Sequence, residues 1–112
     1  MSKISWEDFK KIEIRIGTII EVQDFPEAIK PAYKIRLDLG DKLGIKQSSA
    51  QITDLYKKED LLNKKVLVVT NFLPKKIGPF ISECLITGFY RKDNKVVLAV
   101  PDKKIKNGSL LV

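Results

Sequence analysis

The residues best suited to chemistry gather in one polar stretch, Gly44 to Thr53. It reads Gly-Ile-Lys-Gln-Ser-Ser-Ala-Gln-Ile-Thr. Its amide and hydroxyl side chains offer hydrogen-bond donors and acceptors at close quarters, as a polar ligand surface requires. The candidate ligand-binding residues here are Lys46, Gln47, Ser48, Ser49 and Gln51. The alternative is a loop in which serine and threonine side chains form hydrogen bonds with the backbone of the loop itself.

A second candidate segment combines positive charge with aromatic residues. It runs Asn71-Phe72-Leu73-Pro74-Lys75-Lys76, and Phe80 follows closely. Lysines suit phosphates, and flat rings on a stiff loop suit exposed bases, so the segment is typical of a nucleic-acid contact. The alternative is a plain hairpin connection with core phenylalanines and solvated lysines.

Catalysis is disfavoured by what the chain lacks. It has no histidine, which removes the commonest general base and metal ligand, and no glycine-rich phosphate loop. The one cysteine, Cys84, lies in an apolar strand-like run, so no disulfide and no structural zinc site are expected. We predict a non-enzymatic protein without cofactor or metal.

The net charge of +7 is distributed unevenly. Residues 1–60 hold 11 basic and 11 acidic groups, whereas residues 61–112 hold 10 basic and only 3 acidic groups. A one-sided basic field attracts polyanions such as nucleic acid, or acidic protein surfaces. A lysine-rich surface that serves only solubility is the alternative.

Length and composition fit one domain over residues 1–112. The chain is 44% hydrophobic and 31% charged, which indicates a compact domain with a modest core. No apolar run is long enough for a membrane span, and the N-terminus lacks a signal-peptide pattern, so we expect a cytoplasmic protein without membrane insertion.

The elements that must position these residues are mainly strands. Ser5 and Asp8 predict a capped short helix to about Lys11, after which the apolar period changes to two. A long curved strand is expected, with Ile12, Ile14, Ile16, Thr18, Ile20 and Val22 on one face. Gly17 is where we expect a sharp coil or a bulge.

Further strands are expected at 33–39, 42–48, 65–72, 81–90 and 95–100, with a short helix or turn within 52–62. The sheet face formed by Arg15, Lys34, Arg36 and Lys46 is polar and partly basic, which fits solvent or a ligand. Strand 65–72 is apolar on both faces, and the tail ends in Leu110-Leu111-Val112. We expect the tail to pack on the barrel or on another subunit.

This pattern predicts an all-β protein with short helices: an OB-fold, which is a five-stranded Greek-key barrel, with N- and C-terminal extensions. The motifs that make the resemblance specific are Glu13–Ile19, Phe25–Ala28, Gly44–Ile52, Tyr56, Leu62–Val66, Asn71–Pro74 and Pro101–Asp102. In this order and spacing they resemble the tRNA-binding domain family, and the form of the Ser-Ser-Ala-Gln segment is similar to its export-related, chaperone-like members.

The resemblance implies a homodimer that holds ligands without turning them over. The implied partners are a second copy of the chain, secretory precursor proteins and a translocation motor, or alternatively tRNA. It places the binding surface on the loop from Asn71 to Lys76 and on the strand that starts at Ser82. Relatives carry Ser-x-x-Met in that strand, where this chain has Ser82-Glu83-Cys84-Leu85.

Overall fold

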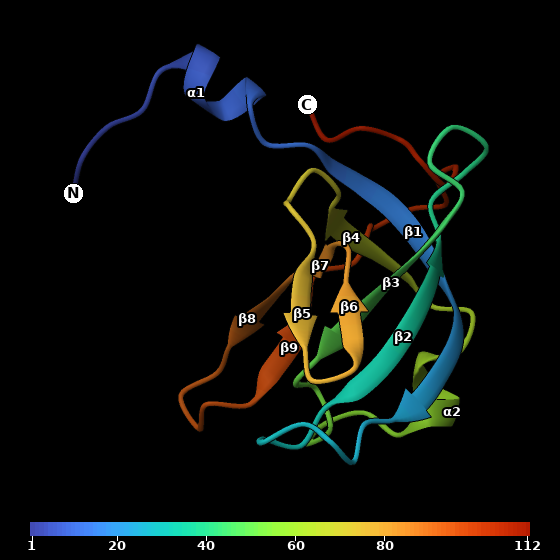
Figure 1. Cartoon of the computed structure of the whole chain (residues 1–112). Helices are drawn as coiled ribbons and strands as arrows, with labels where there is room; N and C mark the ends of the chain where they lie inside the picture. Colours follow the sequence, from blue (N-terminus) through green and yellow to red (C-terminus); the bar gives the residue numbers. More distant parts are fainter.

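The computed structural model describes all 112 residues and forms a small, nearly closed barrel with an arm at its N-terminal end (Figure 1). The elements in chain order are α1 (Trp6–Lys10), β1 (Ile14–Asp24), β2 (Tyr33–Asp38), β3 (Ile45–Ala50), α2 (Lys58–Leu61), β4 (Lys65–Val69), β5 (Lys75–Ile77), β6 (Phe80–Ser82), β7 (Leu85–Ile86), β8 (Gly88–Tyr90) and β9 (Val96–Leu98). Helix α1 has the predicted capping box, since Ser5 Oγ accepts from Asp8 N at 3.1 Å and Ser5 N donates to the Asp8 carboxylate at 3.4 Å.

The main sheet has five strands in the order β3-β2-β1-β4-β7, and every neighbouring pair is antiparallel. Two short hairpins, β5-β6 and β8-β9, complete the structure. This is the OB-fold architecture that the sequence predicted. The fully buried core side chains come mainly from the sheet: Ile19, Ile35, Leu37, Leu39, Leu61, Val66 and Val68.

The single face predicted for the alternate residues Ile12 to Val22 is wrong, because this set changes side partway along β1. Ile14 pairs with Val69 and Ile16 with Leu67, so both isoleucines lie on the face of β1 turned away from the interior residues Val66 and Val68, where Ile16 is buried at 7% exposure. The change follows an irregularity in the β1-β2 register between Ile19 and Glu21. Ile19 lies on the same inner face as Gly17, and beyond the irregularity Val22, opposite Ile35, faces the core, whereas Ile20 is 38% exposed.

Gly17 serves close packing within the barrel. A Cβ on Gly17 would stand 2.7 Å from a methyl of Leu39, so a larger residue requires Leu39 to move. The bulge expected near this glycine lies three residues later, at Ile20. The missing side chain of Gly17 therefore leaves room for Leu39 in the core, whereas the bulge determines which later side chains of β1 point into the core.

Two other segments differ from the sequence prediction. The segment 73–80, expected as a loop, contributes most of the hairpin β5-β6, whose turn contains Gly78 at φ +59. The expected strand 81–90 is divided into β6, β7 and β8. These interruptions matter because they open one side of the barrel, as described below.

The C-terminal segment pairs with the edge of β1 that β2 leaves free at Ile14 to Ile16. Gly108 N donates to Ile16 O at 2.7 Å, and Leu111 N donates to Ile14 O at 2.8 Å. The apolar tail thus lies on the barrel, one of the two predicted positions. Leu110 and Leu111 nevertheless remain 49% and 43% exposed.

Candidate functional site

A cavity of about 610 Å³ lies where the barrel is least complete. Of the residues predicted as ligand-binding, the structure brings five together in its wall: Ser49, Gln51, Lys75, Ser82 and Leu85. They come from the end of β3 and the residue that follows it, and from β5, β6 and β7. The volume lies in the range of ordinary ligand pockets.

The wall is mainly apolar. The residues that complete it are Ala50, Ile52, Ile77, Ile86, Thr87, Gly88, Phe89, Tyr90 and Val96. Lys75 is the one charged residue in the wall, and no carboxylate lines it. A few polar groups on an apolar surface suit an amphipathic ligand better than a bare polyanion.

The cavity exists because β3 and β7 do not pair along their length. Next to the cavity, the boundary between β3 and the β6-β7 segment, called the seam here, is held by individual hydrogen bonds. Glu83 N donates to Gln47 O at 2.8 Å, and the Gln47 side chain donates to Ile81 O at 2.8 Å. Ser49 N reaches Ser82 Oγ at 3.4 Å. Gln47 and Ser82 therefore hold the seam together at the edge of the cavity.

The polar stretch around Ser48 is a strand, and its members face two ways. Ser48 pairs with Ile35 and is fully buried, and its hydroxyl donates to Ser49 O at 3.0 Å. Lys46 lies on the same side as Ser48 and forms an ion pair with Glu83 at 3.9 Å. These two residues support the barrel and are not part of the cavity wall.

Cys84 lies beneath the seam as an unreactive thiol. Its Sγ donates to Gln47 O at 3.6 Å, and burial raises its pKa to about 12, with the nearby Glu83 charge acting in the same direction. At neutral pH the thiol is therefore protonated and a poor nucleophile.

Lys34 and Arg36 lie on the outer face of β2, opposite Ser49 and Gln47 of β3. The ammonium of Lys34 is 5.7 Å from the centre of the Phe25 ring. That ring packs on Phe80 of β6 at 5.4 Å, which holds the β5-β6 hairpin against the barrel. Neither Lys34 nor Arg36 lines the cavity.

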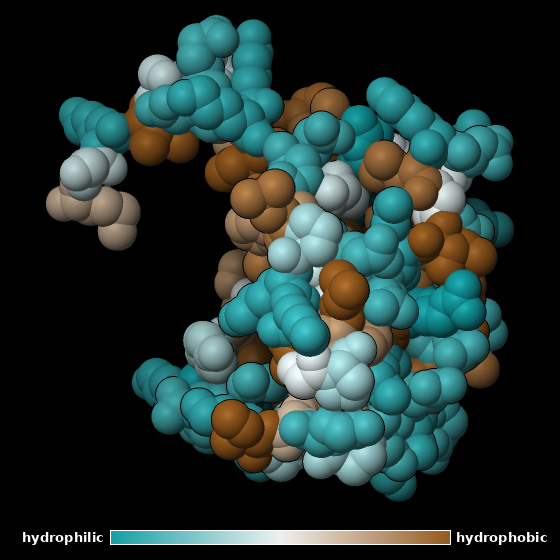
Figure 2. All heavy atoms as spheres, in the orientation of Figure 1, coloured by the Kyte–Doolittle hydropathy of each residue, from teal (hydrophilic) through white to brown (hydrophobic).

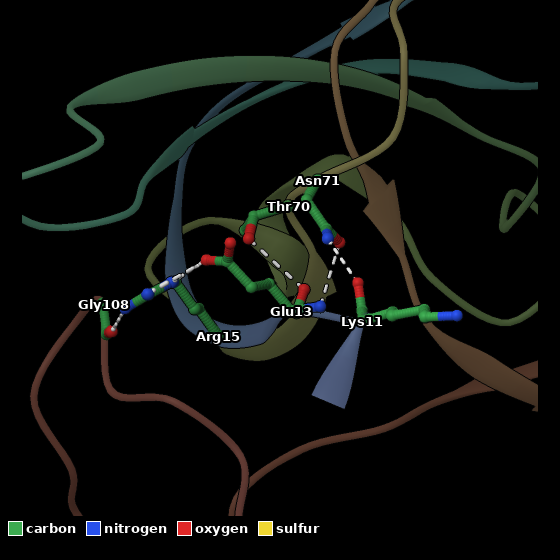
Figure 3. Close-up of polar contacts among 6 residues, drawn as sticks. All are labelled: Lys11, Glu13, Arg15, Thr70, Asn71 and Gly108. Carbon is green, nitrogen blue, oxygen red and sulfur yellow. Dashed lines mark hydrogen bonds and ion pairs between the residues drawn. The ribbon is translucent and has the colours of Figure 1, made fainter. Parts of the chain in front are cut away.

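Two of the predicted residues are engaged in contacts within the chain (Figure 3). Arg15 donates to Glu13 Oε1 at 3.0 Å and to Gly108 O at 2.8 Å, which ties β1 to the C-terminal segment. Asn71 accepts from Glu13 N at 2.9 Å and donates to Lys11 O at 2.6 Å, which ties α1 to the end of β4. Both contacts assign structural roles to these side chains.

The remaining predicted residues, Phe72, Pro74 and Lys76, are exposed on the segment that leads into and along β5. Phe72 is 56% exposed and its neighbour Leu73 is 91% exposed. Figure 2 shows apolar groups reaching the surface along a hollowed margin between the N-terminal arm and the β8-β9 hairpin.

Sequence reasoning missed the aromatic part of the cavity wall. Phe89 and Tyr90 of β8 are 69% and 77% exposed, and both line the cavity. The available signal was their adjacency: consecutive residues of a strand point to opposite faces, so two neighbouring rings cannot both enter one core.

Comparisons with known proteins identify the family of this chain and structures that share its fold. The family model described as "Putative tRNA binding domain" matches residues 14–110, so the chain belongs to the tRNA-binding domain family. The crystal structure of the CsaA chaperone protein from Picrophilus torridus is 51% identical, with a TM-score of 0.92, and the match covers 98% of this chain and 100% of that one. Chaperone CsaA from Bacillus anthracis str. Ames is 40% identical, with a TM-score of 0.93 and coverage of 99% and 100%.

Curated relatives include methionine--tRNA ligases. That of Pyrococcus furiosus is 40% identical over 109 residues, which are 97% of this chain. The chain spans only 14% of the length of that ligase. The similarity therefore concerns the tRNA-binding domain and not the catalytic part of those enzymes.

No group of three or more histidine, cysteine, aspartate or glutamate side chains is placed to hold a metal ion. None of the helices is long and apolar enough to cross a membrane.

Proposed function

We propose that this protein is a chaperone-type binding protein that captures apolar segments of unfolded secretory precursors without catalysing a reaction. The observation that carries the proposal is the cavity of about 610 Å³, whose mainly apolar wall contains a single charged residue, Lys75. Leu85, Phe89 and Tyr90 present apolar surface there, and Ser49 and Ser82 supply polar groups. Likeness to two proteins described as CsaA chaperones supports the same function.

In this proposal the protein works in the cytoplasm as a homodimer and passes precursor segments to a translocation motor. A cavity of about 310 Å³ between β1, β4 and the C-terminal segment supports self-association. It is lined mainly by apolar residues, among them Ile16, Leu67, Leu110 and Leu111. An apolar surface of this kind, left partly exposed on a small barrel, suits a second copy of the chain.

A second candidate function is tRNA binding, which the family model and the charge favour. The excess of positive charge lies in residues 61–112, and Lys75 and Lys76 stand exposed on β5 beside the exposed Phe72. Such a surface would hold phosphates and stack an exposed base.

Salt dependence separates the two functions. Binding of a fluorescent apolar peptide should change little between about 50 and 200 mM salt, whereas tRNA affinity should fall with a log-log slope of about −0.7 to −0.9 per phosphate contacted. The measurement is fluorescence anisotropy with each ligand on the same dimer preparation.

Two variants test which surface binds the peptide and which binds tRNA. Leu85→Lys should weaken peptide binding about tenfold or more and leave tRNA binding intact, because it places a charge in the apolar wall. Lys75→Glu with Lys76→Glu should weaken tRNA binding and leave the binding of an uncharged peptide intact. Loss of both ligands in a folded Leu85→Lys protein, or unchanged peptide affinity, would contradict the proposed site.

A further inference from the structure

Strand β8 has one backbone edge that no other segment uses. On its bonded edge, Ala99 N donates to Thr87 O at 3.1 Å, and Arg91 N donates to Lys95 O at 2.9 Å. Backbone groups alternate between the two edges of a strand, so Phe89, midway between Thr87 and Arg91, also faces β9. The N–H and C=O groups of Gly88 and Tyr90 must then face the opposite edge.

The pairing of β9 agrees with this assignment. Gly88 is opposite Leu98 in the register, yet Leu98 N donates to the hydroxyl of Tyr56 at 3.0 Å and not to β8. Gly88 and Tyr90 are both exposed, and neither makes a hydrogen bond to a loop or a side chain. Two donors and two acceptors are therefore available along this edge.

The free edge of β8 borders the cavity. Gly88, Phe89 and Tyr90 all line it, whereas β9 contributes only Val96, so the cavity lies on the β8 side of the hairpin. Proteins usually protect such edges with charged residues or proline, but β8 reads Gly-Phe-Tyr and has neither. By contrast, strand β5 carries two exposed lysines.

We propose that a polypeptide segment binds here in extended conformation and adds a strand to the free edge of β8. Its backbone pairs with Gly88 and Tyr90, and alternate side chains enter the apolar cavity while the others face solvent. This inference rests on the proposed capture of precursor segments and defines its geometry: the protein recognises backbone in β conformation, with apolar residues at every second position.

The charges near β8 indicate which charged residue the bound segment should carry. Lys75 is in the cavity wall, and the turn after β8 adds Lys92 and Lys95. The one carboxylate of that turn, Asp93, is engaged by Arg91. The cavity wall and this turn together therefore carry a net positive charge, and a segment with an acidic residue beside its apolar positions is favoured over a basic one.

Backbone methylation of the ligand tests the pairing without altering the protein. The probe is a synthetic peptide of about eight residues, with alternating valine and threonine and one glutamate. One version carries N-methyl groups at alternate residues, and a second carries them at the intervening residues. Strand addition predicts that one version binds at least about tenfold more weakly than the parent, because it loses two hydrogen bonds and gains a clash, whereas the other binds within about twofold.

The outcomes separate this inference from the function on which it rests. If the parent peptide binds and both methylated versions bind equally well, peptide capture stands and strand addition is wrong. If the parent peptide does not bind, the proposed function fails with it. Replacing the glutamate of the peptide by lysine should weaken binding about three- to tenfold. The Lys75→Glu protein should instead bind the lysine peptide more tightly than the glutamate peptide, and an unchanged order of the two affinities would refute the assigned charge preference.

Amide hydrogen exchange of the full chain identifies the occupant of the edge. The amides of Gly88 and Tyr90 should exchange rapidly in the free protein and slow at least about tenfold when the parent peptide saturates it. Amides that are already protected in the free dimer, in proportion to its concentration, would show that a second copy occupies the edge and would overturn the proposal.

Discussion

Cys84 illustrates how burial, together with a nearby negative charge, makes a thiol unreactive. Its side chain lies under the β3-β7 seam, 6% of the residue is exposed, and its Sγ donates to Gln47 O. The thiolate would lose solvation there and would face Glu83, so the pKa is raised from 9.0 to about 12. The residue therefore acts as a small apolar side chain with a weak donor.

The raised pKa predicts a pH dependence of stability. Because the folded-state pKa lies above the unfolded value of 9.0, the stabilising contribution is present in full below pH 9 and is lost as the pH rises toward 12. The difference in free energy of unfolding between the protein and Cys84→Ala should therefore shrink above pH 9 by up to about 1.4 kcal/mol per pH unit. Urea unfolding of both proteins at several pH values measures it, and a difference that stays constant from pH 9 upward would contradict the assignment.

At the scale of elements, single side chains attach the two ends of the chain to the barrel. Asn71, just past β4, holds the backbone on both sides of Ile12 and so fixes the path from α1 into β1. Arg15 does the same for the C-terminal segment through Gly108 O. Both contacts join residues far apart in sequence, which gives the short α1 a defined place that its own five residues would not secure.

Asn71→Ala should release the N-terminal arm while the barrel stays folded. The free energy of unfolding should fall by about 1 kcal/mol, since two hydrogen bonds at an exposed site are lost. Hydrogen exchange should accelerate at residues 6–13 and remain unchanged in β2 and β3. Asn71→Asp is the matched control, because it keeps the acceptor for Glu13 N and should retain part of the protection; uniform acceleration across the chain would argue against a local role.

At the scale of the whole molecule, both faces of β4 are apolar, the one inside the barrel and the one outside it. Val66 and Val68 fill its interior, whereas Leu67 and Val69 lie outside, beside Ile14 and Ile16. The C-terminal segment covers this outer side only in part, and Leu110 to Val112 stay substantially exposed. The proposed dimer would bury the remainder.

Removal of residues 110–112 should weaken this dimer. The loss of buried apolar area, at about 25 cal/mol per Å², should raise the dimer dissociation constant at least about tenfold. The control replaces the three residues by serine, which keeps the hydrogen bond from residue 111 N to Ile14 O but removes the apolar contact. Sedimentation equilibrium of the two variants should show the same weakening, and equally stable dimers would rule the interface out.

Much of the architecture was predictable because it follows local rules. The period-two pattern of Tyr33, Ile35 and Leu37 identified β2, and the doubly apolar run after Lys65 identified a strand covered on both faces. The capping box at Ser5 located α1. The motif order from Glu13 to Asp102 indicated the family, which the family model confirms.

The candidate site was predictable only in part. Ser49 and Lys75 were selected for their chemistry and Leu85 through the resemblance to the family, and all three meet in the cavity. Ser48 was selected with them and is buried. The alternation that separates Ser48 from its neighbours depends on the pairing of β3 with β2. The rings of Phe89 and Tyr90 were overlooked because nothing local showed that their strand borders a gap.

The sequence by itself therefore determined the class of fold and the family, since apolar periodicity, turn residues and short motifs act within a few residues of each other. Only the tertiary structure decided which side chains face the core, where the barrel stays open and which edge of β8 is free. These features depend on the bulge at Ile20 and on contacts such as Gln47 with Glu83, 36 residues apart, whose geometry no local pattern encodes.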